Sequence, residues 1–196
     1  MVLSLTIICL VCAALLGVVY SVTAEPIAQT EVAKVNNAIA AVAPEFDNFP
    51  SEDVARYGES EVYTAKMGEN VVGYAIKVKT SGFGGPLQMM VGFTPEGEIY
   101  NTSIISCAET PGLGAKITDE NIQPRVQVVG KNPSVDKISV KKDGGDIDAI
   151  TASTITSRAF LKGVNAAYEV FQQIKPAAAE APADVESQNS EGNEQE

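Results

Sequence analysis

Five hydroxyl side chains stand within the seven residues from Thr151 to Ser157, directly before a segment with helical periodicity. A helix needs only one such residue as its N-cap, so the surplus hydroxyls can serve another purpose. The free N–H groups and the dipole of a helix N-terminus also favour a phosphate group there. The segment is therefore a candidate phosphate site, with helix capping by Ser153 or Thr156 as the simpler interpretation.

A second segment, Glu109 to Lys116, reads ETPGLGAK and follows a predicted strand. Pro111 and Gly112 favour a turn, and N–H groups around Gly112 and Gly114 would form a nest that binds an anion, with Lys116 adding a positive charge. The segment is not a Walker loop, because its spacing is too short and no Gly-Lys-Ser/Thr follows. Taken alone, it is equally typical of a turn and of a nucleotide-binding loop.

A third segment, Ser81 to Pro86, has three glycines in the sequence SGFGGP and lies between two predicted strands. Glycine permits positive φ and lets the backbone approach a ligand closely. On its own, this segment is most simply a glycine-rich hairpin loop.

The composition excludes several kinds of chemistry. The 196 residues include no histidine, which rules out Ser-His-Asp and Cys-His nucleophile systems and histidine-based zinc or haem sites. With 25 acidic and 14 basic residues, the net charge of −11 argues against nucleic-acid binding, which needs clustered Lys and Arg. Cys107, the single cysteine outside the N-terminal run, is interpreted as a buried free thiol. We expect neither a metal site nor catalytic side chains.

The elements that must position the three segments are strands in the middle of the chain and helices at its ends. Amphipathic periodicity predicts one helix over 31–42, ending near Pro44, and a closing helix over 157–174. β-branched and aromatic runs separated by turn residues predict two hairpins and two shorter strands, over 61–67 with 71–79, 87–93 with 99–105, 126–129 and 138–140. This order favours an α+β fold with an antiparallel sheet and flanking helices.

The first 24 residues contain no charged side chain and are dense in Leu, Ile, Val and Ala. About 20 such residues span a bilayer core, so we expect one transmembrane helix over 1–24. A signal peptide cleaved after Val22-Thr23-Ala24 is the alternative, but the run is long for one and lacks a basic flank. Glu25 and Glu31 precede Lys34, which weakly places the soluble part outside the cytoplasm.

The last 21 residues, 176–196, hold six acidic residues and no basic one. Such a segment buries too little apolar surface to offset its ordering entropy, so we expect a disordered acidic tail. The predicted organisation is a transmembrane helix over 1–24, one domain over 25–175 and the tail over 176–196.

Taken together, the three segments resemble the signatures of a known family. Residues 148–154, Asp-x-x-Thr-Ala-Ser-Thr, are similar to the flavinylation motif Asp-x-x-Ser/Thr-Gly-Ala-Ser/Thr of FMN-binding domains. Those domains occur in the G subunit of the Rnf electron transport complex and in the C subunit of the sodium-pumping NADH:quinone reductase. The other two segments resemble further signatures of the family and occur in the same order. The short length of the chain and the residues of the three motifs favour the Rnf protein.

The resemblance implies roles for particular residues. Thr154 matches the threonine whose hydroxyl takes FMN in a phosphoester bond, transferred from FAD by a separate flavin transferase with magnesium. Asp148 opens the sequence that this enzyme recognises. The segment Glu109 to Gly114 and the loop Gly82 to Pro86 would line the flavin. The residues expected to bind it are Gly84, Gly85, Glu109, Thr110, Pro111, Gly112, Leu113, Gly114, Thr151, Ala152 and Ser153.

The chain departs from the family pattern at three positions. Ala152 stands where the family usually has glycine and Ser153 where it usually has alanine. Both residues are small, so the transferase should still have access, but an alanine at 152 is expected to avoid positive φ. Cys107 stands where relatives often carry histidine, so this chain lacks that contact or does not need it.

The resemblance implies a single-pass protein of the bacterial inner membrane with its soluble domain on the periplasmic side. It would relay electrons through FMN beside other membrane and redox subunits, in a complex that couples ferredoxin:NAD⁺ electron transfer to ion pumping. It would be an electron-transfer subunit, not an independent catalyst. The alternatives are a membrane-anchored binding module without redox chemistry, the C subunit of the quinone reductase, and a stand-alone flavoprotein reductase.

Overall fold

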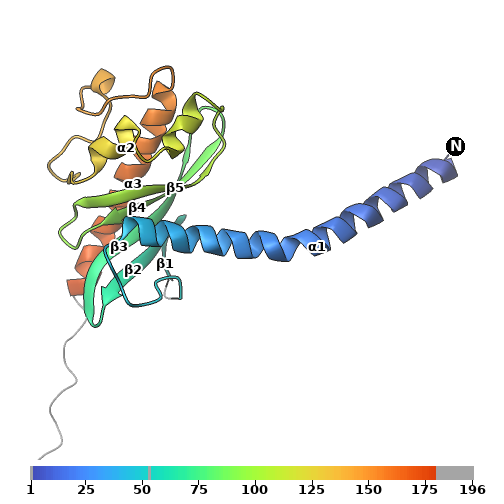
Figure 1. Ribbon diagram of the computed structural model, residues 1–196, viewed down its shortest axis with the longest axis horizontal. Helices are drawn as coiled ribbons and strands as arrows, with labels where there is room; N and C mark the ends of the chain where they lie inside the picture. Colours follow the sequence, from blue (N-terminus) through green and yellow to red (C-terminus); the bar gives the residue numbers. More distant parts are fainter. Residues whose placement is uncertain (1, 53, 180–196) are drawn as a thin grey trace, which may run out of the picture.

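The computed structural model describes residues 2–52 and 54–179, which form a five-stranded sheet between two long helices (Figure 1). The sheet is antiparallel with the strand order β1-β2-β3-β4-β5. The α+β fold expected from the sequence is confirmed. The elements are α1 Val2–Val42, β1 Val54–Tyr57, β2 Ser60–Met67, β3 Asn70–Ser81, β4 Pro86–Phe93, β5 Ile99–Cys107, η1 Gly114–Thr118, α2 Gln123–Val128, η2 Lys141–Asp143 and α3 Thr154–Ala179.

Both predicted hairpins are present. The β2–β3 pair closes with Met67 opposite Asn70, and Gly68 adopts the positive φ of +62° that this tight turn requires. The β4–β5 pair turns through residues 94–98, where Gly97 has a φ of +100°. The predicted boundaries of these four hairpin strands agree with the observed ones to within two residues.

Helix α3 covers one face of the sheet. Phe160, Val164 and Phe171 are fully or almost fully buried along the helix, at the three-and-four spacing that places them on one side. The ring of Phe171 stacks on Phe93 of β4 with centroids 5.2 Å apart. Gly163 lets the helix come close, because a Cβ there would lie 2.6 Å from the sulfur of Met89. The main core therefore lies between α3 and the sheet.

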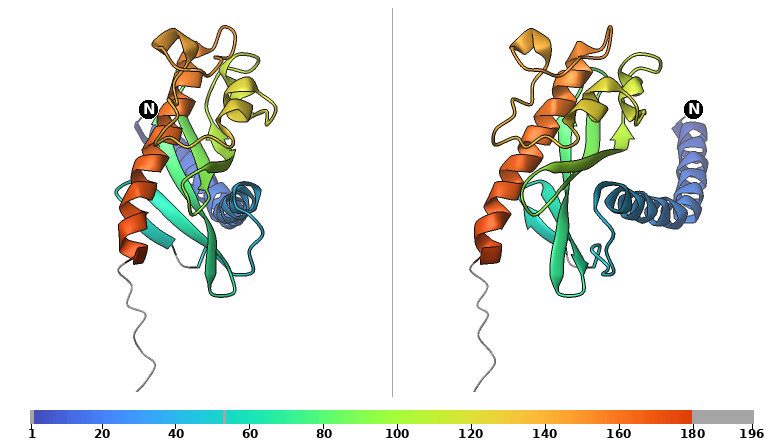
Figure 2. Two further views of the ribbon diagram at one scale, coloured as in Figure 1. Left: turned by 90° about the vertical axis from the view of Figure 1, so that its left-hand side faces the viewer. Right: turned by 60° about the vertical axis from the view of Figure 1, so that its left-hand side comes forward.

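The last turns of α1 cover the opposite face (Figure 2). Ile39 and Val42 are buried there against Tyr63, Ala75 and Met90, which form a second, smaller core. This helix spans 41 residues without a break, so the segments predicted separately over 1–24 and 31–42 are one element. It extends away from the sheet and bends along its length (Figure 1).

The N-terminal part of α1 is long and apolar enough to cross a membrane, and none of its most apolar stretch is buried by the other described residues. Pro26 lies inside the helix and lacks the N–H that would bond to Val22, a common cause of a helix bend. The apolar segment therefore runs into the domain as helix and not as a loop.

Two local predictions were wrong, and one strand was missed. Residues 126–129 were expected as a strand, but most of this segment belongs to helix α2, where Pro124 favours the first turn and the buried Arg125 and Val128 share one side. Residues 138–140 form only an isolated bridge, from Val140 to Ile147. Strand β1 was not anticipated, because its four residues are too few to show an alternating pattern.

Helix α3 continues past the expected domain end at residue 175 to Ala179. Most of the predicted acidic tail, residues 180–196, lies outside the described residues.

Candidate functional site

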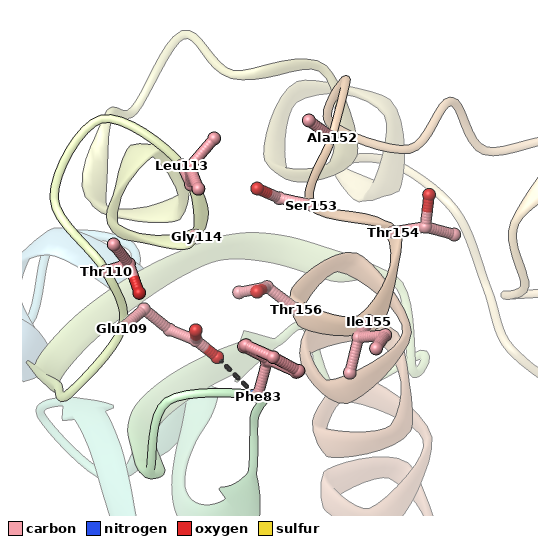
Figure 3. Close-up of a pocket in the computed structure, with 10 residues that line it drawn as sticks. All are labelled: Phe83, Glu109, Thr110, Leu113, Gly114, Ala152, Ser153, Thr154, Ile155 and Thr156. Atoms are coloured by element: carbon pink, nitrogen blue, oxygen red, sulfur yellow. Dashed lines mark hydrogen bonds between the residues drawn. The ribbon is translucent and has the colours of Figure 1, made fainter.

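The three segments selected from the sequence meet at the N-terminus of α3, around a cavity of about 330 Å³ (Figure 3). This volume falls at the lower end of the range of about 300–1,000 Å³ for small-molecule pockets. The lining residues come from the β3–β4 loop, from the segment after β5 and from the start of α3; they are Phe83, Glu109, Thr110, Leu113, Gly114, Ala152, Ser153, Thr154, Ile155 and Thr156.

The start of α3 leaves backbone donors beside this cavity. The first helical hydrogen bond runs from the N–H of Ser157 to the carbonyl of Ser153, at 3.0 Å. Within residues 2–52 and 54–179, the N–H groups of Thr154, Ile155 and Thr156 have no backbone or side-chain acceptor. With the positive end of the helix dipole, they form a site suited to a phosphate group.

Ser153 adds a donor that the rest of the protein does not use. The residue is only 7% exposed, and among the described atoms its Oγ has no hydrogen-bond partner. In Figure 3 this hydroxyl points across the cavity toward Leu113 and Gly114. A buried hydroxyl without a partner is costly, so its position is consistent with a polar group of a ligand in the cavity.

The hydroxyls of this segment are divided between structure and site. Ser157 is completely buried; its Oγ accepts from the N–H of Ile150 at 2.9 Å and donates to the carbonyl of Ser153 at 3.1 Å. It thereby ties the preceding turn to the helix. The capping expected of Ser153 or Thr156 was wrong, because among the described residues neither hydroxyl accepts an N–H group of α3. Thr154 is half-buried and is one of the residues that line the cavity.

Glu109 connects two of the glycine-containing segments. Its carboxylate is 7% exposed and accepts hydrogen bonds from the N–H of Phe83 at 2.7 Å (Figure 3) and from the N–H of Gly84 at 3.1 Å. The neighbouring glycines leave room for it: a Cβ at Gly82 would overlap Oε1, and a Cβ at Gly114 would lie 2.6 Å from Oε2. Both loops are therefore shaped around this one carboxylate.

Ala152 corrects an expectation. An alanine at this position was expected to avoid positive φ, yet Ala152 has a φ of +62° and is the sole non-glycine residue with positive φ in the described part of the chain. This conformation costs an alanine about 1–2 kcal/mol. The surrounding turn imposes it, because Ser153 donates its N–H to the carbonyl of Ile150 while Ser157 binds the same turn from inside.

Replacing Ala152 by glycine should therefore stabilise the protein by about 0.5–1 kcal/mol, since relief of the backbone strain exceeds the entropy that glycine loses on folding. Ala152 is exposed, so little packing is lost. Urea unfolding measures the change. The control is the exposed Ala40 in helix α1, whose substitution by glycine should lower the free energy of unfolding by about 1 kcal/mol. Equal destabilisation by both substitutions would contradict the strain assigned to Ala152.

Asp148 lies outside the cavity lining and is held in a network of its own. Its carboxylate pairs with the Nζ of Lys141 at 2.7 Å and accepts from the amide of Gln127 at 2.8 Å, while the Asp148 N–H donates to the oxygen of Gln127. The hydrogen bonds from Lys141 and then Gln127 hold the pKa of the Asp148 carboxyl below its usual range. The ionised Asp148 carboxylate therefore stabilises the folded protein fully at pH values above the ordinary pKa of Asp. This contribution is lost as the pH falls through the lowered pKa of Asp148 in the folded protein.

The other predicted residues lie around the cavity at varying depth. Thr110, Leu113 and Gly114 line it, whereas Pro111 and Gly112 are exposed in the adjoining turn and Thr151 is exposed beside the start of α3. Gly84 and Gly85 form the β3–β4 loop, close to the backbone and side chain of Ala108. Lys116, expected to add a positive charge, is exposed and does not line the cavity.

The sequence interpretation missed Ile155 and Thr156 as lining residues, and it did not single out Phe83 within the loop Gly82 to Pro86. Phe83 is 74% exposed and Ile155 is 51% exposed at the cavity. Phe83 lies within a segment that was selected for its glycines, and its aromatic character was the available signal. The structural role of Arg125, which does not line the cavity, was also missed. Arg125 is buried on α2 and donates to the carbonyls of Thr102 and Thr118, which fixes the end of η1 against β5.

Comparisons with known proteins agree with this site. Residues 82–169 match the FMN-binding domain family, and this range contains all three segments except Ser81. The chain is 31% identical over 169 residues to the G subunit of the proton-translocating ferredoxin:NAD⁺ oxidoreductase complex of Clostridium ljungdahlii, covering 85% of this chain and 87% of that protein. It is 37% identical over 147 residues to the G subunit of the Na⁺-translocating complex of Acetobacterium woodii, covering 67% and 70%.

Two further comparisons extend over much of the chain. Among solved structures, the comparison finds the C subunit of the Na⁺-translocating NADH-quinone reductase of Parabacteroides distasonis, at 23% identity and a TM-score of 0.46 over 59% of this chain and 62% of that one. The G subunit of an ion-translocating oxidoreductase complex from Shewanella piezotolerans is 30% identical over 92% of both chains. The chain therefore belongs to the G-subunit family of ion-translocating oxidoreductase complexes and contains that family's FMN-binding domain.

Proposed function

We propose that this chain is the membrane-anchored flavoprotein subunit of an ion-translocating ferredoxin:NAD⁺ oxidoreductase complex, with FMN joined to Thr154 through a phosphoester. A flavin transferase would attach the FMN, and other membrane and redox subunits would exchange electrons with it. The chain would act as an electron-transfer subunit and not as an independent catalyst. The soluble domain would lie on the periplasmic side, since acidic residues precede the first lysine after the apolar run.

The observation that carries this proposal is the fit between the start of α3 and a phosphoester. Thr154 is accessible at the cavity edge, the N–H groups of residues 154–156 have no acceptor in the described chain, and the Ser153 hydroxyl is buried without a partner. These donors would offset the charge that the phosphate keeps after esterification. A binding module without a flavin would have no use for this arrangement.

The residues of the cavity would hold the flavin in defined ways. Phe83, Leu113 and Ile155 supply apolar surface for a flat ring, while Thr110 and Ser153 supply hydroxyls. Bound FMN supplies the redox chemistry, because it can gain and lose electrons singly. The protein need not donate a proton from a histidine, and the sequence contains none. The phosphoester would keep the cofactor in place in a compartment with little free flavin.

The test is production of the full chain in membranes with and without a flavin transferase. With the transferase and magnesium, the chain should remain fluorescent under ultraviolet light after denaturing electrophoresis; without the transferase, the band should be dark. A band that is dark in both cases would overturn the covalent attachment. A fluorescent band that does not need the transferase would overturn the proposed route of maturation.

A further inference from the structure

Glu109 is a negative charge enclosed in the wall of the cavity. The residue is only 7% exposed, and none of the ion pairs among the described residues involves it. Its partners are the two backbone N–H groups of Phe83 and Gly84, which are dipoles and carry no net charge. The side chain thus brings one uncompensated negative charge to the site.

We propose that Glu109 is a positioning and tuning residue whose negative charge lowers the reduction potential of the flavin in this cavity. The inference rests on the proposed function, because it needs FMN to be bound there. An electron added to the flavin ring increases its negative charge unless a proton accompanies it, and a nearby carboxylate makes that addition less favourable. Glu109 neither gives nor takes electrons in this account.

The effect should be large because the charge is buried. A unit charge about 10 Å from the flavin, in surroundings with an effective dielectric constant of about 20, changes the equilibrium constant for adding an electron by roughly tenfold. Exposed carboxylates act less strongly, since water and salt screen them. Glu109 lines the cavity itself, so no layer of solvent separates it from a ligand there.

The positive end of α3 opposes this charge, but it is already engaged. A helix N-terminus is equivalent to roughly half a positive charge. In the proposed complex that partial charge faces the flavin phosphate, which is itself negative. The N–H groups of Thr154 to Thr156 would therefore be used at the phosphate end, and Glu109 would act on the ring without compensation.

The carboxylate also has a structural role, and the test must separate the two. Both of its oxygens accept N–H bonds, whereas a glutamine in its place would accept with one oxygen and turn an NH₂ group toward the other donor. Glu109→Gln thus removes the charge and weakens the contact with the β3–β4 loop. Glu109→Asp shortens the side chain and so disturbs the same loop, but it keeps the negative charge of the carboxylate.

The experiment measures the flavin midpoint potential of the full, flavinylated chain by spectroelectrochemical titration. Glu109→Gln should raise the potential by about 59 mV, the tenfold change for a one-electron couple, whereas Glu109→Asp should shift it by much less. Glu96→Gln removes a charge in the β4–β5 turn, at the other end of α3 from the cavity, and should leave the potential unchanged. An unchanged potential in Glu109→Gln, or equal shifts in the Gln and Asp variants, would overturn the inference.

Two further measurements keep the result decisive. If Glu109→Gln does not retain flavin, the variant Thr110→Lys is measured in its place. Thr110 is exposed at the cavity, and a positive charge beside the Glu109 carboxylate should also raise the flavin potential. The control is Thr110→Gln, whose potential should be lower than that of Thr110→Lys. Equal potentials in that pair would contradict the proposal. The flavin content of the wild type is measured first. Absence of flavin would overturn the proposed function. Bound flavin whose midpoint potential does not change in the variants would overturn this inference alone.

Discussion

Replacing Thr154 by alanine is expected to abolish the covalent flavin completely. The phosphoester needs a hydroxyl at the cavity edge, and Thr154 is the residue that combines accessibility with a place in the first turn of α3. The fold should persist, because the side-chain contacts that hold this turn come from Ser157. In the gel assay the Thr154→Ala band should be dark, while the protein should unfold at nearly the same temperature as the wild type.

The neighbouring hydroxyls provide matched controls for this substitution. Thr156→Ala and Ser153→Ala remove hydroxyls from the same cavity and should keep a fluorescent band, because neither residue is the proposed acceptor. Thr154→Ser retains a hydroxyl and should keep part of the signal. A fluorescent Thr154→Ala band together with a dark Ser153→Ala or Thr156→Ala band would move the attachment site to that residue.

Replacing Gly92 by alanine should destabilise the domain by about 3 kcal/mol or more. Gly92 lies on β4 where the end of α1 crosses the sheet, and an added Cβ would overlap the backbone carbonyl of Val42. A backbone atom cannot move aside as a flexible side chain can. The helix would have to lift from the sheet and would expose Ile39 and Val42, which are buried at that contact.

Thermal unfolding of the detergent-solubilised chain and limited proteolysis report this change. In Gly92→Ala, the unfolding temperature should fall and the segment after α1 should become sensitive to protease. Gly17→Ala is the control, since a Cβ at Gly17 would meet nothing within 4 Å and alanine favours a helix. If the two variants unfolded at the same temperature, α1 would not be packed on the sheet as described. The contact matters to function because it fixes the flavin domain to the membrane anchor.

Strong local patterns allowed much of the fold to be predicted. The hairpin around Gly68 and the closing helix follow from alternation, turn residues and three-and-four spacing, which depend on the nearby sequence alone. Helix α2 was mistaken for a strand because its few β-branched residues suit either element, and the burial of Arg125 depends on partners that are distant in sequence. The continuity of α1 across Pro26 was also unforeseen, because a proline is usually a reason to end a helix.

The site could be predicted as a set of segments but not as a geometry. No local pattern indicates that Glu109 binds the backbone of Phe83, 26 residues earlier, or that Gly82 and Gly114 leave room for its carboxylate. The positive φ of Ala152 was wrongly excluded because intrinsic preference was weighed without the hydrogen bonds of the turn around it. Motifs thus indicated which residues matter, and tertiary contacts determined what each of them does.

Mass spectrometry of the tryptic peptide that contains Thr154 tests the central claim most directly. Cleavage after Lys142 and Arg158 releases residues 143–158, which include all five hydroxyls from Thr151 to Ser157, so fragmentation is needed to locate the group. Protein made with its flavin transferase should yield this peptide heavier by FMN less one water, with the added mass on fragments that contain Thr154. An unmodified peptide, or an added mass confined to another of the five hydroxyls, would contradict the proposed attachment.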